Sequence, residues 1–405
     1  MKRNVSLEEA QQLLLAHGAP PGTEEVYFHD ALGRVLSENL VAQENVPPFS
    51  RSPYDGYAFR AADTVQATPE QPVFLEVIEE VPAGYAPQAK LQAGQAVKIL
   101  TGAPVPEGAD VVEKFEATTR QGNQVAVYGS YRPGTNIIPA GEDVTAGEVI
   151  AYQGQVVDPP LVGLVAALGM VKVRVYQRPE IAIISTGDEL LEVDEPLRPG
   201  KIRNSNSHAL AAYCAALGGA PKVLKTPRDR VADIGAAIEA GLEQAHLVIT
   251  TGGVSVGDYD LVQEALISIG AEILYWQIDM KPGAPTLAAV KNGKVILSLS
   301  GNPASAMVVF QLLGIPFIRK LLGRADYLLP EVQVILKDGF GKASPSRRFI
   351  RGKLVYEQGR IYMGSTGNQR NSNLRSMIGC DVLAEIPAGS GPVPAGTELK
   401  AYLLK

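Results

Sequence analysis

The sequence predicts a multidomain α/β plus β protein whose central part is a doubly wound α/β sheet domain. The chain has 405 residues, too many for one hydrophobic core, because single domains rarely exceed about 300 residues. Strand-like and helix-like segments alternate between residues 179 and 327, a pattern typical of a parallel, doubly wound sheet. The 41 glycines and 29 prolines indicate many turns and argue against a long helical bundle.

The composition excludes several classes of protein. Hydrophobic residues make up 46% of the chain and charged residues 20%, which is ordinary for a globular protein and argues against disorder. A net charge of −6 without a lysine- and arginine-rich run argues against nucleic acid as a partner. We expect no membrane span and no signal region, because no apolar stretch reaches about 20 residues. The two distant cysteines, Cys214 and Cys380, suit a cytoplasmic protein without a disulfide framework.

A short helix over residues 7–16 is the first element that we expect. Ser6 and Glu9 form a capping box that opens this helix, and Gly18 suits its C-terminal end. A second helical pattern appears at 158–170, and packing of the two segments against each other would make the first domain discontinuous.

The segment from 46 to 145 has a different character. It is rich in proline and glycine and has short alternating runs such as Val73–Ile78 and Gln124–Tyr128, typical of an irregular β domain. Four domains are therefore expected. They are an elongated discontinuous linker domain (1–45 and 146–178), a β-rich insertion domain (46–145), the α/β domain (179–327) and a small C-terminal β-barrel (328–405).

Buried strands and helices alternate in the α/β domain, and short strands dominate after it. The expected strands of the α/β domain are 181–185, 246–250 and 295–299, and its expected helices are 209–217, 231–245, 261–269 and 303–313. The expected strands of the C-terminal domain are 332–336, 353–356, 382–386 and 399–404.

Three loops at expected strand ends form the candidate site, because ligands of doubly wound sheets bind at the carboxyl ends of the strands. The loops are Ser185–Leu190, Thr250–Asp260 and Ser300–Ala306. Their glycines allow close approach of an anion, and we expect free N–H donors where the third loop enters a helix. Carboxylates in the same loops repel a phosphate unless Mg²⁺ lies between them. The expected metal ligands are Asp188, Glu189, Asp258 and Asp260.

Each of these features also has an ordinary structural explanation that involves no ligand. Any one loop alone is explained by turn-forming glycine and aspartate, although three loops at one sheet edge favour a site. Gly253–Gly257 matches the G-x-S-x-G nucleophile elbow, but no histidine follows His246 to act as the base of a hydrolase. The four histidines have no zinc-ligand spacing.

Eight short motifs follow one another between about residues 45 and 310. They are Ser52–Ala58, Thr101–Pro104 with Gly108–Asp110, Gly141–Asp143, Ser185–Leu190, Asn204–Asn206, Gly252–Gly257, Lys281–Gly283 and Gly301–Pro303. Weaker matches follow at Phe349–Gly352 and Ser365–Gln369. In this order the motifs resemble the molybdopterin molybdenumtransferase family, the MoeA-like proteins related to the E domain of gephyrin.

The resemblance implies a function in molybdenum cofactor biosynthesis. Such enzymes take adenylylated molybdopterin, cleave its pyrophosphate link in a step that depends on Mg²⁺ and molybdate, and release AMP and molybdenum cofactor. The resemblance also implies a MogA-like sheet domain, a homodimer whose cleft combines this domain with the partner's insertion domain, and an adenylyltransferase of the MogA type as a partner. The alternatives are a tungstate-inserting relative, a non-catalytic molybdopterin-binding scaffold, and a Mg²⁺-dependent phosphohydrolase of another nucleotide conjugate.

The resemblance also implies roles for individual residues. The implied catalytic residues are Asp55, Thr101, Asp143, Glu189, Asp229 and Asp260. The implied substrate-binding residues are Ser185, Thr186, Gly187, Gly252, Gly253, Ser255, Lys281, Gly301, Asn302, Pro303, Arg351 and Ser372. The sequence departs from the family pattern at Ala284, Ser300, Asn371 and 137–140, and two of these departures remove positive charge. The preference between molybdate and tungstate therefore stays open.

Overall fold

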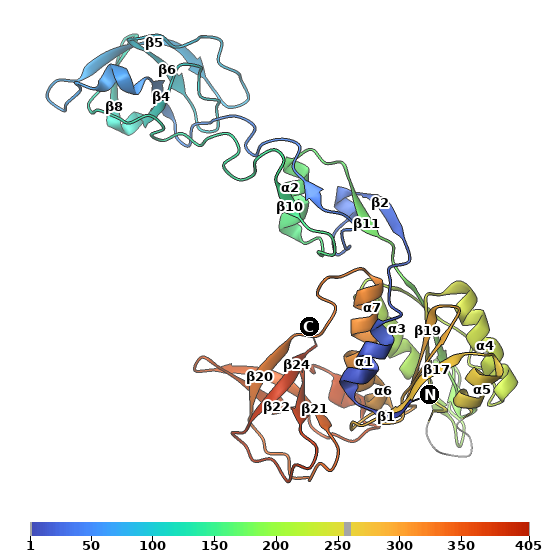
Figure 1. Cartoon of the computed structure of the whole chain (residues 1–405). Coiled ribbons are helices and arrows are strands. Elements are labelled where there is room, and N and C mark those ends of the chain that lie inside the picture. Colours follow the sequence, from blue (N-terminus) through green and yellow to red (C-terminus); the bar gives the residue numbers. More distant parts are fainter. Residues whose placement is uncertain (1, 255–260, 405) are drawn as a thin grey trace. The chain divides into compact units, whose positions relative to one another are not determined.

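A computed structural model describes residues 2–254 and 261–404 of the chain (Figure 1). The chain forms two compact units. Unit 1 comprises Met1–Glu38, Gln153–Asp158 and Lys172–Lys405, and unit 2 comprises Asn39–Tyr152 and Pro159–Val171. The division into four domains is finer than these two units and stays a prediction.

A seven-stranded sheet with the order β1-β17-β18-β19-β16-β12-β15 forms the centre of unit 1. The strands are β1 (Lys2–Val5), β12 (Glu180–Ser185), β15 (Ala220–Val223), β16 (Leu247–Thr251), β17 (Glu272–Ile278), β18 (Leu287–Lys291) and β19 (Lys294–Leu299). The three strands that we predicted in this domain are confirmed as β12, β16 and β19, and these three run parallel.

One strand departs from the parallel arrangement that the sequence pattern predicted, because β18 runs antiparallel to both β17 and β19. The reason is the two-residue turn between β18 and β19. Asn292 and Gly293 both have positive φ angles, 53° and 75°, as a type I′ hairpin turn requires. Such a turn joins antiparallel strands only, and the Asn-Gly pair is its usual sequence signal.

Helices cover both faces of this sheet, which confirms the doubly wound architecture. The helices are α1 (Leu7–Leu15), α3 (Asn206–Ala216), α4 (Val231–Gln244), α5 (Val262–Ser268), α6 (Pro303–Val309) and α7 (Ile315–Leu321). Alternate residues of β12 face two cores: Ile181 and Ile183 pack with α1, α3, α6 and α7, whereas Ala182 and Ile184 pack with α4 and α5. The predicted cap of α1 is present, since Ser6 Oγ accepts from the Glu9 amide at 3.1 Å.

A π-helical turn over Phe310–Gly314 joins α6 to α7. Pro316 has no N–H and therefore leaves the carbonyl of Leu312 without its usual helical donor. The side chain of Gln11 on α1 supplies the donor instead, with Nε2 2.8 Å from that oxygen. The helical stretch Pro303–Leu321 is apolar enough to cross a membrane by composition, but 89% of it is buried inside the fold, as expected of a core helix.

The C-terminal part of unit 1 is a closed five-stranded barrel, as predicted, with the order β20-β22-β21-β23-β24. Its strands are β20 (Glu331–Leu336), β21 (Arg348–Glu357), β22 (Arg360–Ser365), β23 (Val382–Ile386) and β24 (Glu398–Leu403). β22 was not predicted. Unit 1 also contains two small strand pairs, β2 (Thr23–Tyr27) with β11 (Lys172–Tyr176) and β13 (Leu190–Leu191) with β14 (Ile202–Arg203). Two 3₁₀ turns lie at Phe28–Asp30 and Leu374–Met377.

Unit 2 contains a six-stranded sheet with the order β7-β4-β6-β5-β9-β8. Its strands are β4 (Gly56–Phe59), β5 (Val73–Val81), β6 (Gln95–Ile99), β7 (Val111–Lys114), β8 (Thr118–Gln121) and β9 (Gln124–Val127). Tyr57 and Phe59 face one apolar cluster and Ala58 faces another, so the sheet is buried on both sides. Unit 2 also contains β3 (Leu40–Val41), β10 (Val149–Ala151), α2 (Pro159–Ala167) and 3₁₀ turns at Ala61–Thr64 and Phe115–Ala117.

Candidate functional site

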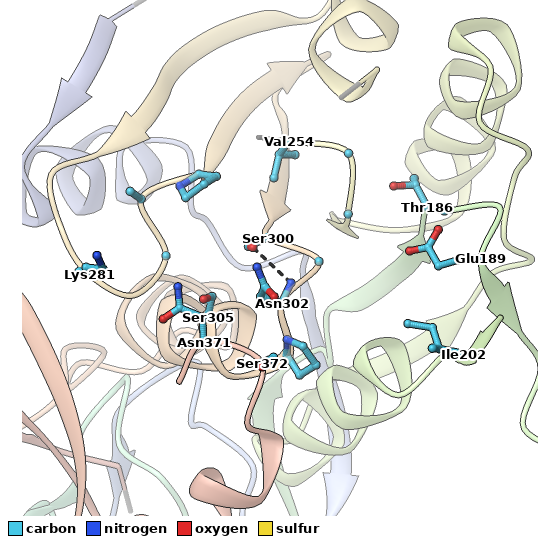
Figure 2. A pocket seen from close by; sticks show the side chains of 18 of the residues that line it. Thr186, Glu189, Ile202, Val254, Lys281, Ser300, Asn302, Ser305, Asn371 and Ser372 are labelled. Carbon is cyan, nitrogen blue, oxygen red and sulfur yellow. Dashed lines mark hydrogen bonds between the residues drawn. The ribbon is translucent and has the colours of Figure 1, made fainter. Parts of the chain in front are cut away.

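A cavity of about 930 Å³ opens at the carboxyl ends of β12, β16 and β19 (Figure 2). Polar side chains and glycines dominate its wall. The lining residues are Thr186, Gly187, Glu189, Ile202, Asp229, Gly252, Gly253, Val254, Met280, Lys281, Gly283, Ala284, Pro285, Ser300, Gly301, Asn302, Pro303, Ser305, Ser346, Asn371 and Ser372. The three loops that we singled out from the sequence therefore meet in one cavity.

Many of the predicted site residues lie in this wall, although their roles stay predictions. They are Thr186, Gly187, Glu189, Asp229, Gly252, Gly253, Lys281, Gly301, Asn302, Pro303 and Ser372. Ser185, Asp188 and Arg351 do not line the cavity. Ser255, Asp258 and Asp260 lie outside the described residues.

Close backbone approach explains the glycines of the β16 loop. Gly252 has a φ angle of 104°, and a Cβ atom there would lie 2.4 Å from the carbonyl oxygen of Thr186. Asn206 on α3 ties two of the loops together, since its Nδ2 donates to Thr251 Oγ1 at 2.9 Å and to the carbonyl of Gly301 at 3.0 Å. The loops therefore form a tightly packed floor.

Two buried polar atoms at this floor belong to Thr186 and Asn206. Thr186 Oγ1 and Asn206 Oδ1 have no hydrogen-bond partner among the described residues. A buried polar group without a partner is costly, so an unpaired hydroxyl in a cavity wall suits a polar ligand. The sequence motif alone does not distinguish Thr186 from its neighbour Ser185, whose hydroxyl donates to Asn204 Oδ1 at 2.9 Å.

The expectation of free donors at the N-terminus of α6 is wrong. Pro303 has no N–H, and the amides of Ala304 and Ser305 donate to the carbonyl of Asn371 at 3.0 and 3.3 Å. Asn371 belongs to the barrel and lines the cavity. The Asn371 carbonyl can accept from these two amides because the barrel packs against α6. Local sequence patterns do not reveal this contact.

Carboxylates gather at one side of the cavity. Asp188 and Asp229 hold each other through backbone amides: the Asp188 amide donates to Asp229 Oδ2 at 2.9 Å, and the Asp229 amide donates to Asp188 Oδ1 at 3.2 Å. Glu189 and Asp229 line the cavity. Over residues 2–254 and 261–404, no three acidic, histidine or cysteine side chains form a ready-made metal cluster. Two carboxylates nevertheless suit Mg²⁺, which usually takes one or two together with substrate phosphates.

Lys281 is the one lysine or arginine among the described lining residues. Its ammonium has no hydrogen bond or ion pair to the part of the chain that the structure describes. Its backbone is well held, because its amide donates to the carbonyl of Arg347 and its carbonyl accepts from the amide of Phe349, both at 2.8 Å. Ala284, where the family often has a second lysine, also lines the cavity and leaves Lys281 as its main cation.

Arg351 lies on β21 and is fully buried, on the strand face that also carries Phe349 and not on the face of the barrel-core residue Ile350. Its Nη2 donates to the carbonyl of Arg370 at 3.4 Å, whereas Nε and Nη1 have no partner among the described residues. Burial lowers the pKa of this guanidinium. Ser372, another predicted substrate-binding residue, lines the cavity, whereas Arg351 does not.

Asp55 and Thr101 form the second candidate site, in unit 2. Asp55 Oδ1 accepts from both the amide and the hydroxyl of Thr101, each at 2.7 Å. The backbone hydrogen bond, followed by the hydroxyl, holds the pKa of Asp55 below its ordinary value. Asp143, the third predicted residue in unit 2, is exposed. The structure therefore joins two predicted residues that are 46 positions apart.

Three family models match consecutive parts of the chain. The MoeA N-terminal region (domains I and II) matches residues 5–169, the probable molybdopterin binding domain matches 182–320, and the MoeA C-terminal region (domain IV) matches 333–404.

Individual relatives match along nearly the whole chain. The molybdopterin molybdenumtransferase of Bacillus subtilis is 36% identical over 388 residues, which cover 95% of this chain and 90% of that protein. The molybdopterin molybdenumtransferase of a Staphylococcus epidermidis strain is 33% identical over 98% of this chain and 95% of that protein. A crystal structure of the molybdopterin biosynthesis MoeA protein of Pyrococcus horikoshii is similar with a TM-score of 0.87 and 32% identity, and covers 99% of both chains.

Proposed function

The chain belongs to the family of MoeA-type molybdopterin molybdenumtransferases, and from this premise we propose that it inserts molybdenum into adenylylated molybdopterin. The observation that carries the proposal is the cavity at the strand ends, where Lys281 faces a wall that also holds Glu189 and Asp229. A cavity with two carboxylates, and with an ammonium and a hydroxyl that no described residue pairs, suits a substrate that combines an oxyanion with a pyrophosphate.

The side chains divide the work by charge. The ammonium of Lys281 would hold an anionic group, either molybdate or a phosphate of the substrate, by a charge-assisted hydrogen bond. Thr186 Oγ1, which has no partner among the described residues, would donate to another substrate oxygen. Glu189 and Asp229 would hold Mg²⁺, which, when bound, neutralises charge that develops on phosphate oxygens. Hydrolysis of the pyrophosphate link by one water molecule would give AMP and the pterin monophosphate, whose dithiolene is then free to bind molybdenum.

The wider setting of this reaction is also part of the proposal. Following the family resemblance, we propose a homodimer in which Asp55, Thr101 and Asp143 of unit 2 take part in the reaction. An adenylyltransferase of the MogA type would supply the substrate. The free, buried thiols of Cys214 and Cys380 suit a reducing compartment such as the cytoplasm.

AMP release from adenylylated molybdopterin tests the proposal directly. Purified protein with Mg²⁺ is given molybdate, tungstate or no oxyanion, and we expect release only with an oxyanion. Lys281→Ala should raise the KM for the oxyanion at least tenfold, whereas Lys342→Ala, an exposed lysine outside the cavity, should not. Absence of AMP release under all three conditions from folded protein would overturn the proposed function and favour a non-catalytic scaffold.

Tungstate is included because of one specific observation. Ala284 lines the cavity at a position where the family often has a lysine, so a feature that could discriminate between oxyanions is missing. Turnover with tungstate at the rate seen with molybdate would show that this cavity does not distinguish the two ions. Turnover with tungstate alone would identify a tungstate-inserting relative.

A further inference from the structure

One guanidinium fastens the barrel to the first helix of the chain. Arg347 Nη1 donates to both carboxylate oxygens of Glu8 on α1, at 2.7 and 2.8 Å. Its Nη2 donates to Glu385 Oε2 on β23 at 2.7 Å and to Tyr402 Oη on β24 at 3.2 Å. Only 17% of the Arg347 side chain and 17% of the Glu385 side chain are exposed, so solvent screens this pair less than an ordinary surface ion pair.

The backbone of the same residue holds the lysine of the cavity. The carbonyl of Arg347 accepts from the Lys281 amide, and the amide of Phe349 donates to the Lys281 carbonyl, both at 2.8 Å. Lys281 thereby extends the barrel edge as a short parallel bridge to Arg348. Ser346, which precedes Arg347, lines the cavity itself. Any shift of this strand start therefore moves Lys281 with it.

The other attachments of the Lys281 loop lie on the sheet side. The amide of Ile278 donates to the carbonyl of Ala284 at 3.0 Å, and the amide of Asp279 donates to the carbonyl of Val5 at 2.9 Å. The Lys281 ammonium itself has no partner among the described residues. Its four-carbon stem is flexible, so the position of its charge depends on where the backbone is held. That backbone is held by Arg347 and Phe349.

We propose that Arg347 is a positioning residue that sets Lys281 at the cavity wall for its anionic ligand. The inference rests on the proposed function, in which Lys281 binds an oxyanion or phosphate. Arg347 does not line the cavity. The hydrogen bonds of its guanidinium to Glu8, Glu385 and Tyr402 hold the start of β21 in place. The carbonyl of Arg347 accepts from the Lys281 amide, so the position of Lys281 depends on the position of Arg347. Nη1 bonds both oxygens of Glu8 while Nη2 bonds Glu385, and the planar guanidinium holds these two nitrogens at a fixed separation that a lysine ammonium does not have.

A double-mutant cycle tests whether Arg347 acts through Lys281. Arg347→Gln should raise the KM for molybdate in the AMP-release assay about five- to tenfold and leave kcat within about twofold. Arg347→Lys should recover part of the loss. In a Lys281→Ala background, Arg347→Gln should add less than a twofold further change. Equal effects in both backgrounds would overturn the proposal, because Arg347 would then act on the fold in general.

Two further sets of variants distinguish the positioning role of Arg347 from a general loss of folding. Glu357→Gln breaks an exposed barrel ion pair with Lys337 and should leave the KM unchanged. If Arg347→Gln does not fold, Glu8→Gln and Glu385→Gln each weaken one arm of the network and should raise the KM about two- to threefold. Unchanged KM values in both folded variants would contradict the proposal.

Binding of molybdate separates this inference from the proposed function. Trp276 is the single tryptophan of the chain, and its indole N–H lies 3.5 Å from the carbonyl of Val254, a cavity residue. Its fluorescence can therefore report molybdate binding without turnover. If the wild type releases no AMP, the proposed function fails. In that case, weaker molybdate binding by Arg347→Gln only when Lys281 is present would support the positioning role, and equal binding by wild type and variant would overturn it.

Discussion

The side-chain amide of Gln11 donates to the carbonyl oxygen of Leu312 over 2.8 Å, although the two residues lie 301 positions apart. Pro316 creates the need for this bond, because it cannot donate to the carbonyl four residues before it. The contact joins the first helix to the buried π-helical turn between α6 and α7. The carbonyl that this helix irregularity leaves without a helical donor thus receives a hydrogen bond from a side chain some 300 positions away.

Gln11→Ala should lower the free energy of unfolding of unit 1 by about 1–3 kcal/mol, since it leaves a buried carbonyl without a donor. Helix propensity acts slightly against this loss, because alanine is the best helix former, so an observed loss reports the missing hydrogen bond. Chemical denaturation of the two proteins measures the difference. Gln12→Ala, at an exposed position of the same helix, is the matched control. Equal losses for the two variants would show that the bond to Leu312 contributes nothing.

Gly283→Ala should be more damaging than an ordinary glycine substitution. Gly283 has a φ angle of 101°, and a Cβ atom there would lie 2.1 Å from Cγ2 of Val309. We expect a loss of about 2–4 kcal/mol, the sum of left-handed strain and overpacking. Gly293 also has a positive φ angle, 75°, but has open space around it. Gly293→Ala should therefore lower the stability only by the cost of the left-handed backbone. Thermal unfolding compares the two, and similar melting temperatures would contradict the steric argument.

Thr101→Val should raise the pKa of Asp55 part of the way to its ordinary value. The substitution removes the hydroxyl donor but keeps the backbone N–H, which is the larger cause of the lowered pKa. The stabilisation from this contact exists above the unfolded pKa of aspartate and is lost as the pH falls through the lower folded pKa. A carbon-detected NMR titration of Asp55 measures the shift, with Thr119→Val, an exposed threonine of β8, as control. Titration curves that superimpose would rule out a contribution from the hydroxyl.

Glu8 should make the stability of unit 1 depend on pH in acid. Burial acts to raise the pKa of Glu8, but the hydrogen bond and charge of Arg347 outweigh it, so the pKa lies below the ordinary 4.5. Glu8→Gln should therefore destabilise the protein above about pH 5, and the difference should vanish as the pH falls through the folded pKa. Because 56% of the Glu8 side chain is exposed, we expect less than about 1 kcal/mol.

Urea denaturation at pH 7 and at pH 3 checks the prediction for Glu8. Glu44→Gln, at an exposed position of unit 2, controls for a general effect of removing one negative charge. A difference between wild type and Glu8→Gln that stays the same at both values of pH would show that the ion pair with Arg347 is not its source.

Local sequence signals were sufficient for much of the fold. The capping box at Ser6 predicted α1, and runs of buried aliphatic residues predicted β12, β16 and β19. The antiparallel β18 was missed although Asn292 and Gly293 carry a hairpin signal, because the apolar run after Gly283 was not read as a strand. β1 could not be found from its own sequence, since Lys2–Val5 is a strand only by virtue of pairing with β17.

The candidate site shows the same limit. Glycines and hydroxyls at strand ends predicted where the cavity would lie, because topology brings parallel strand ends to one edge. Whether each polar group is free to bind a ligand depends on residues distant in sequence. The carbonyl of Asn371 accepts from the first amides of α6, and Asn204 accepts from the hydroxyl of Ser185. The full burial of Arg351 could not be predicted from its strand sequence either, since the burial of a strand residue depends on tertiary packing.

The place of β1 at the sheet edge has a consequence for protein synthesis. Lys2, Arg3 and Val5 pair with Tyr275, Trp276 and Ile278, so β1 can join the sheet only after a partner some 270 positions later in the sequence has been synthesised. At a translation rate of about 5–20 residues per second, that delay is on the order of tens of seconds. All of unit 2 emerges in the meantime. The apolar residues Leu7, Ala10 and Leu14 of α1, which follow β1 directly, therefore have their core partners on α6 and α7 only after most of unit 1 has been synthesised.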